Sequence, residues 1–135
     1  MKDTDTTYDG KSCFVCGPAN PISLAVKFRL ENDICRGEFT PGDNHCGWDG
    51  VTHGGIIFSV LDDVMANWIY LNGMKGYTAK CEVRFRNPLP TGCKVLLEGF
   101  PTNRRRNLVM LEGKVTREDN QQVIADCQAS FMLAP

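Results

Sequence analysis

The feature that most constrains the fold is a change of hydrophobic period about halfway along the chain. From Ile56 the apolar residues come as doublets four positions apart, which is the repeat of an α-helix. The doublets are Ile56/Ile57, Val60/Leu61, Val64/Met65 and Trp68/Ile69. Because an ordinary surface helix carries a broad polar stripe and this segment does not, we expect a central core helix. We also expect it to be too short and too polar to span a membrane.

The two ends of this helix and its acidic residues are the first candidates for function. Thr52 is the expected N-cap, and Asn72-Gly73 is the expected stop. Gly54 and Gly55 leave the first-turn amides uncovered by side chains, and a helix N-terminus attracts anions or the oxygen of a polarised carbonyl. Asp62 and Asp63 are ionisable groups in an otherwise apolar helix, which rarely buries such groups without a reason.

Beyond the helix, apolar residues alternate with polar ones, as in strands with one face in water. We expect strands at 78–85, 93–100, 108–117 and 123–131, with Thr78 on the polar phase of the first, and turns at 90–92, 102–103 and 118–120. Before the helix, residues 24–30 and 35–39 form an expected hairpin. The order predicts an α+β fold in which an antiparallel sheet of about six strands, the last four in a meander, wraps around one long helix.

Composition fits one domain and excludes some partners. The 135 residues are 42% hydrophobic and 23% charged, so we divide the chain into an N-terminal extension, residues 1–20, and a single domain, residues 21–135. A net charge of -1 argues against nucleic acid or an anionic membrane as a partner. The polar N-terminus has no signal-peptide core, so we expect a cytoplasmic protein. An unprotected sheet edge favours a homodimer, with a dimer of dimers left open.

The seven cysteines do not suggest a disulfide framework, because several lie on the apolar phase of strands, where a free thiol acts as a small hydrophobe. Cys13 and Cys16 have the spacing of metal ligands. A structural zinc site needs four ligands, and the additions that the sequence offers are His45 and Cys46. We interpret the pair as a turn with reduced thiols, keep zinc as the alternative, and expect no metal and no cofactor.

Two short sequences carry a family resemblance. Gly-Val-Thr-His-Gly-Gly at 50–55 is followed by Leu61-Asp62, and Cys-Phe-Val-Cys-Gly-Pro-Ala-Asn-Pro at 13–21 leads into the domain. With the order of strands and helix, residues 21–134 resemble the hotdog-fold acyl-CoA thioesterases, in particular the subgroup similar to phenylacetyl-CoA thioesterases. The resemblance implies a hotdog fold, hydrolysis of an acyl-CoA to a free acid and coenzyme A, and a site shared across a dimer interface.

Thioester hydrolysis needs donors directed at the carbonyl oxygen and a carboxylate that activates water or attacks the carbonyl. The Gly54 amide can supply the first and Asp62 the second, but they lie roughly 12 Å apart along one helix, so two subunits must combine. The resemblance implies that Thr78 positions the water or the carboxylate and that His53 orients the thioester. Asp63 points about 100° away around the helix, and the spacing from His53 favours Asp62.

Other residues complete the expected site, each with a simpler reading beside it. Arg104, Arg105 and Arg106 can bind the phosphates of coenzyme A or form a solvated hairpin tip. Phe58, Met65 and Trp68 are expected to line an apolar slot for the acyl group. The alternatives to catalytic roles are that Asp62 is a paired surface residue, that His53 is a structural hydrogen-bonding residue, and that Thr78 is an ordinary strand residue. Some relatives carry an asparagine or glutamine shortly before the motif histidine, and residues 45–50 have none.

Two other functions stay open at this point. One is an acyl-thioester dehydratase or hydratase of the same fold, although such enzymes place their histidine and acid differently. The other is a non-catalytic module that binds acyl-CoA. The sequence does not decide the acyl chain, or whether Asp62 acts as nucleophile or general base.

Overall fold

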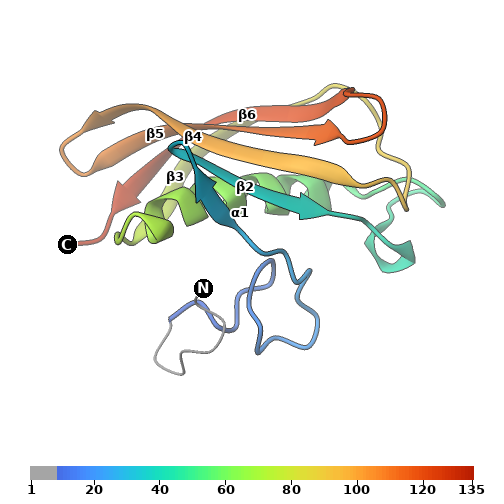
Figure 1. Ribbon diagram of the computed structural model, residues 1–135, viewed down its shortest axis with the longest axis horizontal. Coiled ribbons are helices and arrows are strands. Elements are labelled where there is room, and N and C mark those ends of the chain that lie inside the picture. The colour runs from blue at the N-terminus through green and yellow to red at the C-terminus, as the bar shows by residue number, and fades with distance from the viewer. Residues whose placement is uncertain (1–8) are drawn as a thin grey trace.

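The computed structural model describes residues 9–135 and shows one curled sheet over one long helix (Figure 1). The helix is α1 (Gly54–Leu71), preceded by a short 3-10 helix, η1 (Asp43–His45). The strands are β1 (Arg29–Glu31), β2 (Ile34–Phe39), β3 (Gly76–Phe85), β4 (Val95–Arg105), β5 (Leu108–Arg117) and β6 (Val123–Leu133). All five strand pairings are antiparallel. The predicted α+β hotdog arrangement is confirmed.

The strand order corrects the expected meander of the last four strands. The sheet runs β1-β2-β4-β5-β6-β3, so only β4, β5 and β6 form a meander. β4 pairs with β2, and β3 lies at the far edge beside β6. The reason is that α1, at about 1.5 Å per residue, carries the chain across the sheet before β3 begins.

One expected strand and one expected turn lie elsewhere in the structure. The expected strand at 24–30 shrinks to β1, because Ala25 has a φ of 58° and Val26 N–H donates to Val15 O rather than to a strand. The expected turn at 102–103 is a bulge inside β4, and the hairpin turns at Arg106, which has a φ of 55°. A bulge inserts one residue while the strand stays paired. In the local sequence this interruption looks like a turn.

The ends of α1 are partly as expected. Asn72 is the C-cap and Gly73 follows at a φ of 82°, which confirms the stop. The N-cap is His53 rather than Thr52, since His53 Nδ1 accepts a hydrogen bond from Gly55 N–H at 2.8 Å. A side-chain acceptor at this position satisfies one of the orphan amides of the first turn.

The apolar length of α1 also corrects one expectation. Its 18 residues are long and apolar enough to cross a membrane by length and composition, and it is the one such helix found among residues 9–135. Its packing is that of a core helix, because Leu61, Val64 and Met65 have no exposed surface beneath the sheet.

A row of small residues lets α1 approach the sheet closely. Cys35, Gly99, Gly113 and Cys127 are register partners across β2, β4, β5 and β6. A Cβ added to Gly99 would lie 2.8 Å from the carbonyl oxygen of Val64, so the helix backbone rests on this strand. We call these four residues the small-residue row.

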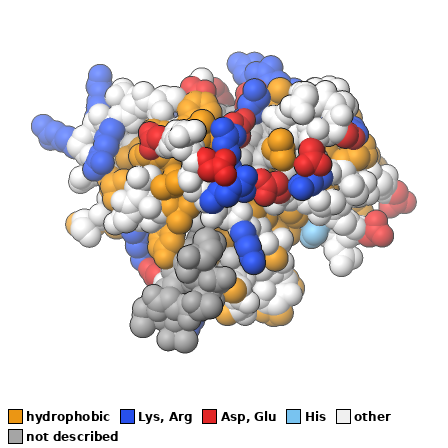
Figure 2. Space-filling view, viewed as in Figure 1, with side chains coloured by type: hydrophobic (Ala, Val, Ile, Leu, Met, Phe, Trp, Pro, Cys, Tyr) orange, Lys and Arg blue, Asp and Glu red, His pale blue; other side chains and the backbone are white. Residues whose placement is uncertain are grey.

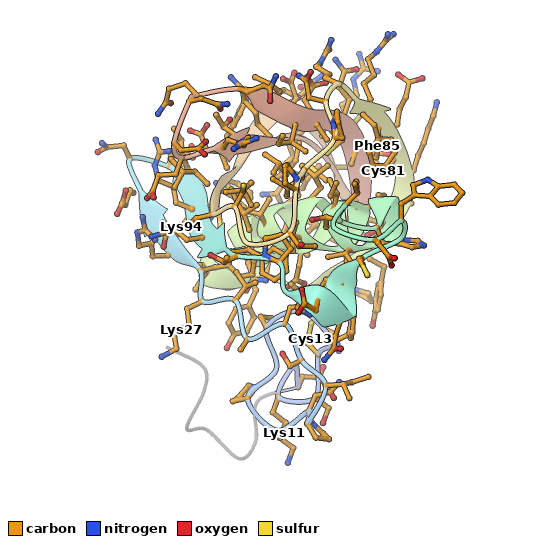
Figure 3. All side chains as sticks on the ribbon, turned by 90° about the vertical axis from the view of Figure 1, so that its right-hand side faces the viewer. Lys11, Cys13, Lys27, Cys81, Phe85 and Lys94 are labelled. Carbon is orange, nitrogen blue, oxygen red and sulfur yellow. The ribbon has the colours of Figure 1, made fainter. Side chains whose placement is uncertain are left out.

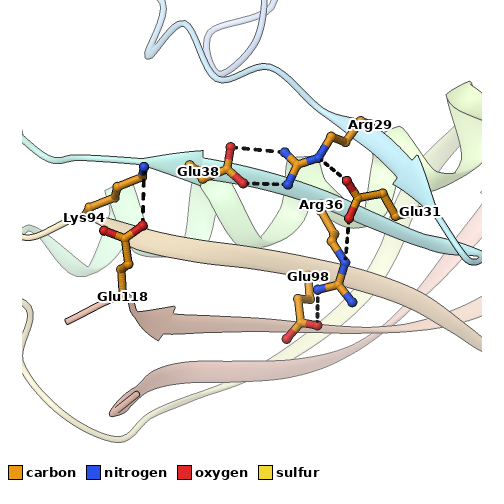
Figure 4. Close-up of polar contacts among 7 residues, drawn as sticks. All are labelled: Arg29, Glu31, Arg36, Glu38, Lys94, Glu98 and Glu118. Carbon is orange, nitrogen blue, oxygen red and sulfur yellow. Dashed lines mark hydrogen bonds and ion pairs between the residues drawn. The ribbon is translucent and has the colours of Figure 1, made fainter. Parts of the chain in front are cut away.

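The two edges of the sheet differ. β1 has three residues, and both of its charged side chains form ion pairs: Arg29 binds Glu31 and Glu38, and Glu31 also binds Arg36 of β2 (Figure 4). Short, charged edges resist pairing with another chain. β3 is ten residues long and has one strand neighbour, β6. The β3 edge is therefore the one available for sheet extension.

Candidate active site

Asp62 and Thr78 lie together although 16 positions separate them. Asp62 is half-buried on the flank of α1 that faces β3, and Thr78 Oγ1 donates a hydrogen bond of 2.6 Å to Asp62 Oδ1. The register of β3 shifts between Thr78 and Lys80. A bulge there moves Thr78 off the polar phase that the alternation predicts and turns it toward the helix.

The surroundings of Asp62 set its acidity. Burial raises the pKa of Asp62 above its ordinary value, and the hydrogen bond from Thr78 partly opposes this by favouring the carboxylate. A carboxylate with a raised pKa accepts a proton more readily near neutral pH, which suits a general base.

Asp63 lies on the other flank of the same helix. Its Oδ1 is 3.7 Å from Cys13 Sγ, and its Oδ2 accepts a hydrogen bond of 3.1 Å from Asn67 Nδ2. Figure 3 shows Cys13 on one side of α1 and Cys81 and Phe85, both from β3, on the other. The adjacent carboxylates thus face different segments, as the helical spacing predicts, and Asp62 is the one beside Thr78.

The first turn of α1 offers one amide rather than two. The Gly55 amide is used by His53, whereas the first-turn amide of Gly54 has no acceptor within the helix. Because His53 Nδ1 accepts, a neutral ring carries its proton on Nε2 and presents a donor there. Gly55 therefore shapes the turn. The Gly54 amide and the Nε2–H of His53 are the two groups that can donate a hydrogen bond to a ligand.

Of the three residues expected to line an acyl slot, Phe58 alone reaches the surface, with 38% of its area exposed. Met65 is fully buried against Cys127, and Trp68 is buried with its Nε1 donating to Asp33 O at 3.1 Å. Phe85 is exposed close to Gly54, since its ring would lie 3.6 Å from a Cβ at that glycine. Phe58 and Phe85 are therefore two accessible apolar side chains near the start of α1.

The arginines at 104–106 are exposed at the tip of the β4–β5 hairpin, beside the C-terminal end of α1 (Figure 1). Figure 2 shows Lys and Arg side chains gathered at that end of the molecule. Arg104 Nη1 is 3.7 Å from Met74 Sδ, just beyond the helix. Within one chain, this basic tip and Gly54 lie at opposite ends of α1.

A hollow of about 1310 Å³ lies at the basic end and not at Asp62. Its lining includes Cys13, Asp63, Tyr70, Tyr77 and Arg104, and does not include Asp62, Thr78 or Gly54. The residues that the sequence assigns to chemistry are therefore not gathered in this hollow of the single chain.

Comparison with known protein families assigns the chain to one of them. A sequence model of the Thioesterase superfamily matches residues 49–124, which include His53, Gly54, Asp62 and Thr78. The chain therefore belongs to the thioesterase superfamily, as its sequence predicted.

Individual relatives agree with this assignment. The chain is 32% identical over 91 residues to acyl-coenzyme A thioesterase THEM4 of Xenopus laevis, a match that covers 67% of this chain and 34% of that protein. The chain thus spans about a third of the length of this relative. The crystal structure of RHA08564, a thioesterase superfamily protein, has a TM-score of 0.80 and 26% identity, covering 87% of this chain and 61% of that one.

The PaaI protein of E. coli, from the phenylacetic acid degradation operon, has a TM-score of 0.77 and 14% identity, covering 83% of this chain and 81% of that one. At this identity the likeness shows the shared fold. Assignment to the phenylacetyl-CoA thioesterase subgroup remains a prediction from the sequence motifs.

Proposed function

We propose that the protein hydrolyses an acyl-CoA thioester to a free carboxylic acid and coenzyme A. The observation that carries this proposal is the 2.6 Å hydrogen bond from Thr78 to the half-buried carboxylate of Asp62. It fixes a carboxylate of raised pKa in a member of the thioesterase superfamily. The match to a protein named as an acyl-coenzyme A thioesterase supports acyl-CoA as the substrate class.

In this mechanism Asp62 removes a proton from water as the water oxygen attacks the thioester carbonyl, or its own oxygen attacks and forms an anhydride that water then opens. The Gly54 amide, with the Nε2–H of His53, stabilises the negative charge that develops on the carbonyl oxygen. The C–S bond then breaks, and coenzyme A leaves as a thiolate that takes up a proton. Thr78 holds Asp62 in place throughout.

The proposal includes a homodimer, because Gly54 and Asp62 lie roughly 12 Å apart along one helix and cannot share one carbonyl. The β3 edge supports this arrangement, since it is long and carries exposed Tyr77 and Phe85, at 60% and 56%. Antiparallel pairing of two β3 edges sets the two α1 helices side by side. The N-terminus of one α1 then approaches the basic tip of the partner, where residues 104–106 can bind the phosphates of coenzyme A.

A cytoplasmic location is part of the same proposal. Among the described residues, Cys46, Cys81, Cys93 and Cys127 carry free thiols. Free thiols are typical of proteins kept in a reducing compartment.

The test is release of free thiol from short-chain, medium-chain and aromatic acyl-CoAs. We expect turnover by the wild type and a loss of about 10²- to 10⁴-fold in kcat for Asp62→Asn, which keeps the shape but not the basicity of the side chain. Glu82→Gln is the matched control, because it neutralises an exposed carboxylate on β3. Binding of acyl-CoA without turnover would instead indicate a non-catalytic module, and hydration of an enoyl thioester without thiol release a hydratase.

A further inference from the structure

Three side chains of metal-ligand type meet on the flank of α1 opposite Asp62. The ligand atoms of Cys13, Cys16 and Asp63 all lie within 4.8 Å of one another. Cys13 Sγ is 3.7 and 3.8 Å from the two carboxylate oxygens of Asp63, and Cys16 Sγ is 3.8 Å from Nδ2 of Asn67. The proposed hydrolysis uses none of these groups.

The separations fit a shared ion. With Zn–S bonds of about 2.3 Å and Zn–O bonds of about 2.0–2.2 Å, tetrahedral ligands lie about 3.5–3.8 Å from one another. The distance from Cys13 Sγ to Asp63 is 3.7 Å. Two sulfur ligands select zinc over magnesium or calcium, which prefer all-oxygen sites.

The backbone of the N-terminal segment is shaped to present both thiols. Gly17 N–H donates to Cys13 O at 2.9 Å, and the Val15 amide donates to Cys13 Sγ at 3.4 Å. A Cβ on Gly17 would lie 2.2 Å from Cys13 N, so the turn is too tight for any other residue. An amide aimed at a sulfur favours its thiolate form, which is the form that binds metals.

We propose that Cys13, Cys16 and Asp63 form a binding site for Zn²⁺ that fastens the N-terminal segment to α1. Binding replaces the two thiol protons, which pass to solvent, and the carboxylate supplies the third ligand. The hollow beside the cluster, lined by Cys13, Cys16, Asp63 and Asn67, gives access to a water molecule as the fourth ligand.

This ligand set differs from the one that the sequence offered. His45 Nδ1 accepts a hydrogen bond from Gly42 N–H, and Cys46 Sγ donates to Asp43 O. Neither belongs to the cluster. The third ligand comes from the central helix, 47 positions after Cys16 in the chain, where no spacing rule would look for it.

The experiment uses the full chain, purified with a non-chelating reductant, stripped of metal and titrated with Zn²⁺ against a chromophoric chelator and, separately, with Co²⁺. We expect one ion per chain and a thiolate-to-cobalt charge-transfer absorption. Cys13→Ser and the nearly isosteric Asp63→Asn should each weaken zinc binding about tenfold or more. Cys46→Ser and Cys93→Ser are the matched controls and should bind as the wild type does.

Further measurements separate a lost ligand from a lost fold and from the proposed hydrolysis. Circular dichroism should show that Asp63→Asn is folded, and the melting temperature should rise with zinc concentration in the wild type but not in Cys13→Ser. Asp62→Asn should bind zinc as the wild type does. The proposed hydrolysis can therefore fail its test without affecting the test of the zinc site. Equal zinc binding by wild type and Cys13→Ser, or a Cys13–Cys16 disulfide recovered from zinc-supplemented cells, would overturn the proposal.

Discussion

Replacing Thr78 with valine removes the hydroxyl that donates to Asp62 and keeps the size and β-branching of the side chain. Hydrogen bonds to charged groups contribute about 1.5–3 kcal/mol. If this bond holds the carboxylate through the transition state, its loss lowers kcat/KM by about ten- to hundredfold, at about 1.4 kcal/mol per factor of ten. Because Thr78 is itself exposed in the single chain, water competes for the bond, and we expect the lower end of that range.

The assay is kcat/KM for thiol release as a function of pH. The Thr78 bond lowers the pKa of Asp62 against the effect of burial, so its loss should move the acid limb of the Thr78→Val profile to higher pH. Thr78→Ser keeps the hydroxyl and should retain both the rate and the position of the limb. Wild-type activity with an unshifted limb in Thr78→Val would refute the assignment of Thr78 as the residue that positions Asp62.

Three other predictions concern the carboxylate, the core and the basic tip. Burial raises the pKa of Asp62, so the wild type loses stability as pH rises through that folded-state pKa. Asp62→Asn should therefore be the more stable protein at neutral pH in urea unfolding, and the difference should vanish below the ordinary aspartate pKa of 3.8. Gly99→Ala pushes a methyl group into the α1 backbone and should lower the free energy of unfolding by about 1–3 kcal/mol in the same assay, whereas Gly42→Ala, with its nearest atom at 3.9 Å, should not. Alanine at all three positions 104–106 should raise KM for acyl-CoA by about tenfold at low salt and leave KM for an acyl thioester without the nucleotide unchanged.

The hydrophobic period predicted where the helix and most strands lie, but not which strands pair. Alternation tells which face of a strand is buried and carries no information about its neighbour, so the position of β3 beside β6 was missed. The residues at 24–30 alternate in hydrophobicity as a strand would, yet Val26 bonds to Val15 of the N-terminal segment. That contact depends on the N-terminal extension, which is far from residues 24–30 in any local pattern of hydrophobicity.

The candidate site shows the same limit at the level of single residues. Asp62 and Gly54 could be selected from the sequence because a buried charge and a bare helix start are local features. Thr78 lies on the polar phase of its strand, and it reaches Asp62 because one inserted residue reverses that phase. Alternation alone pointed it the wrong way, and only the family resemblance selected it. The contact between Cys13 and Asp63 spans 50 positions and has no local signature at all.

The small-residue row sets the rotation of α1 about its own axis. Gly99 meets the backbone at Val64, directly after the two aspartates. Since adjacent residues differ by about 100° around a helix, a modest rotation would withdraw Asp62 from Thr78 and Asp63 from Cys13 in the same movement. A bulkier side chain in the middle of the sheet should therefore disturb two surfaces that never touch each other.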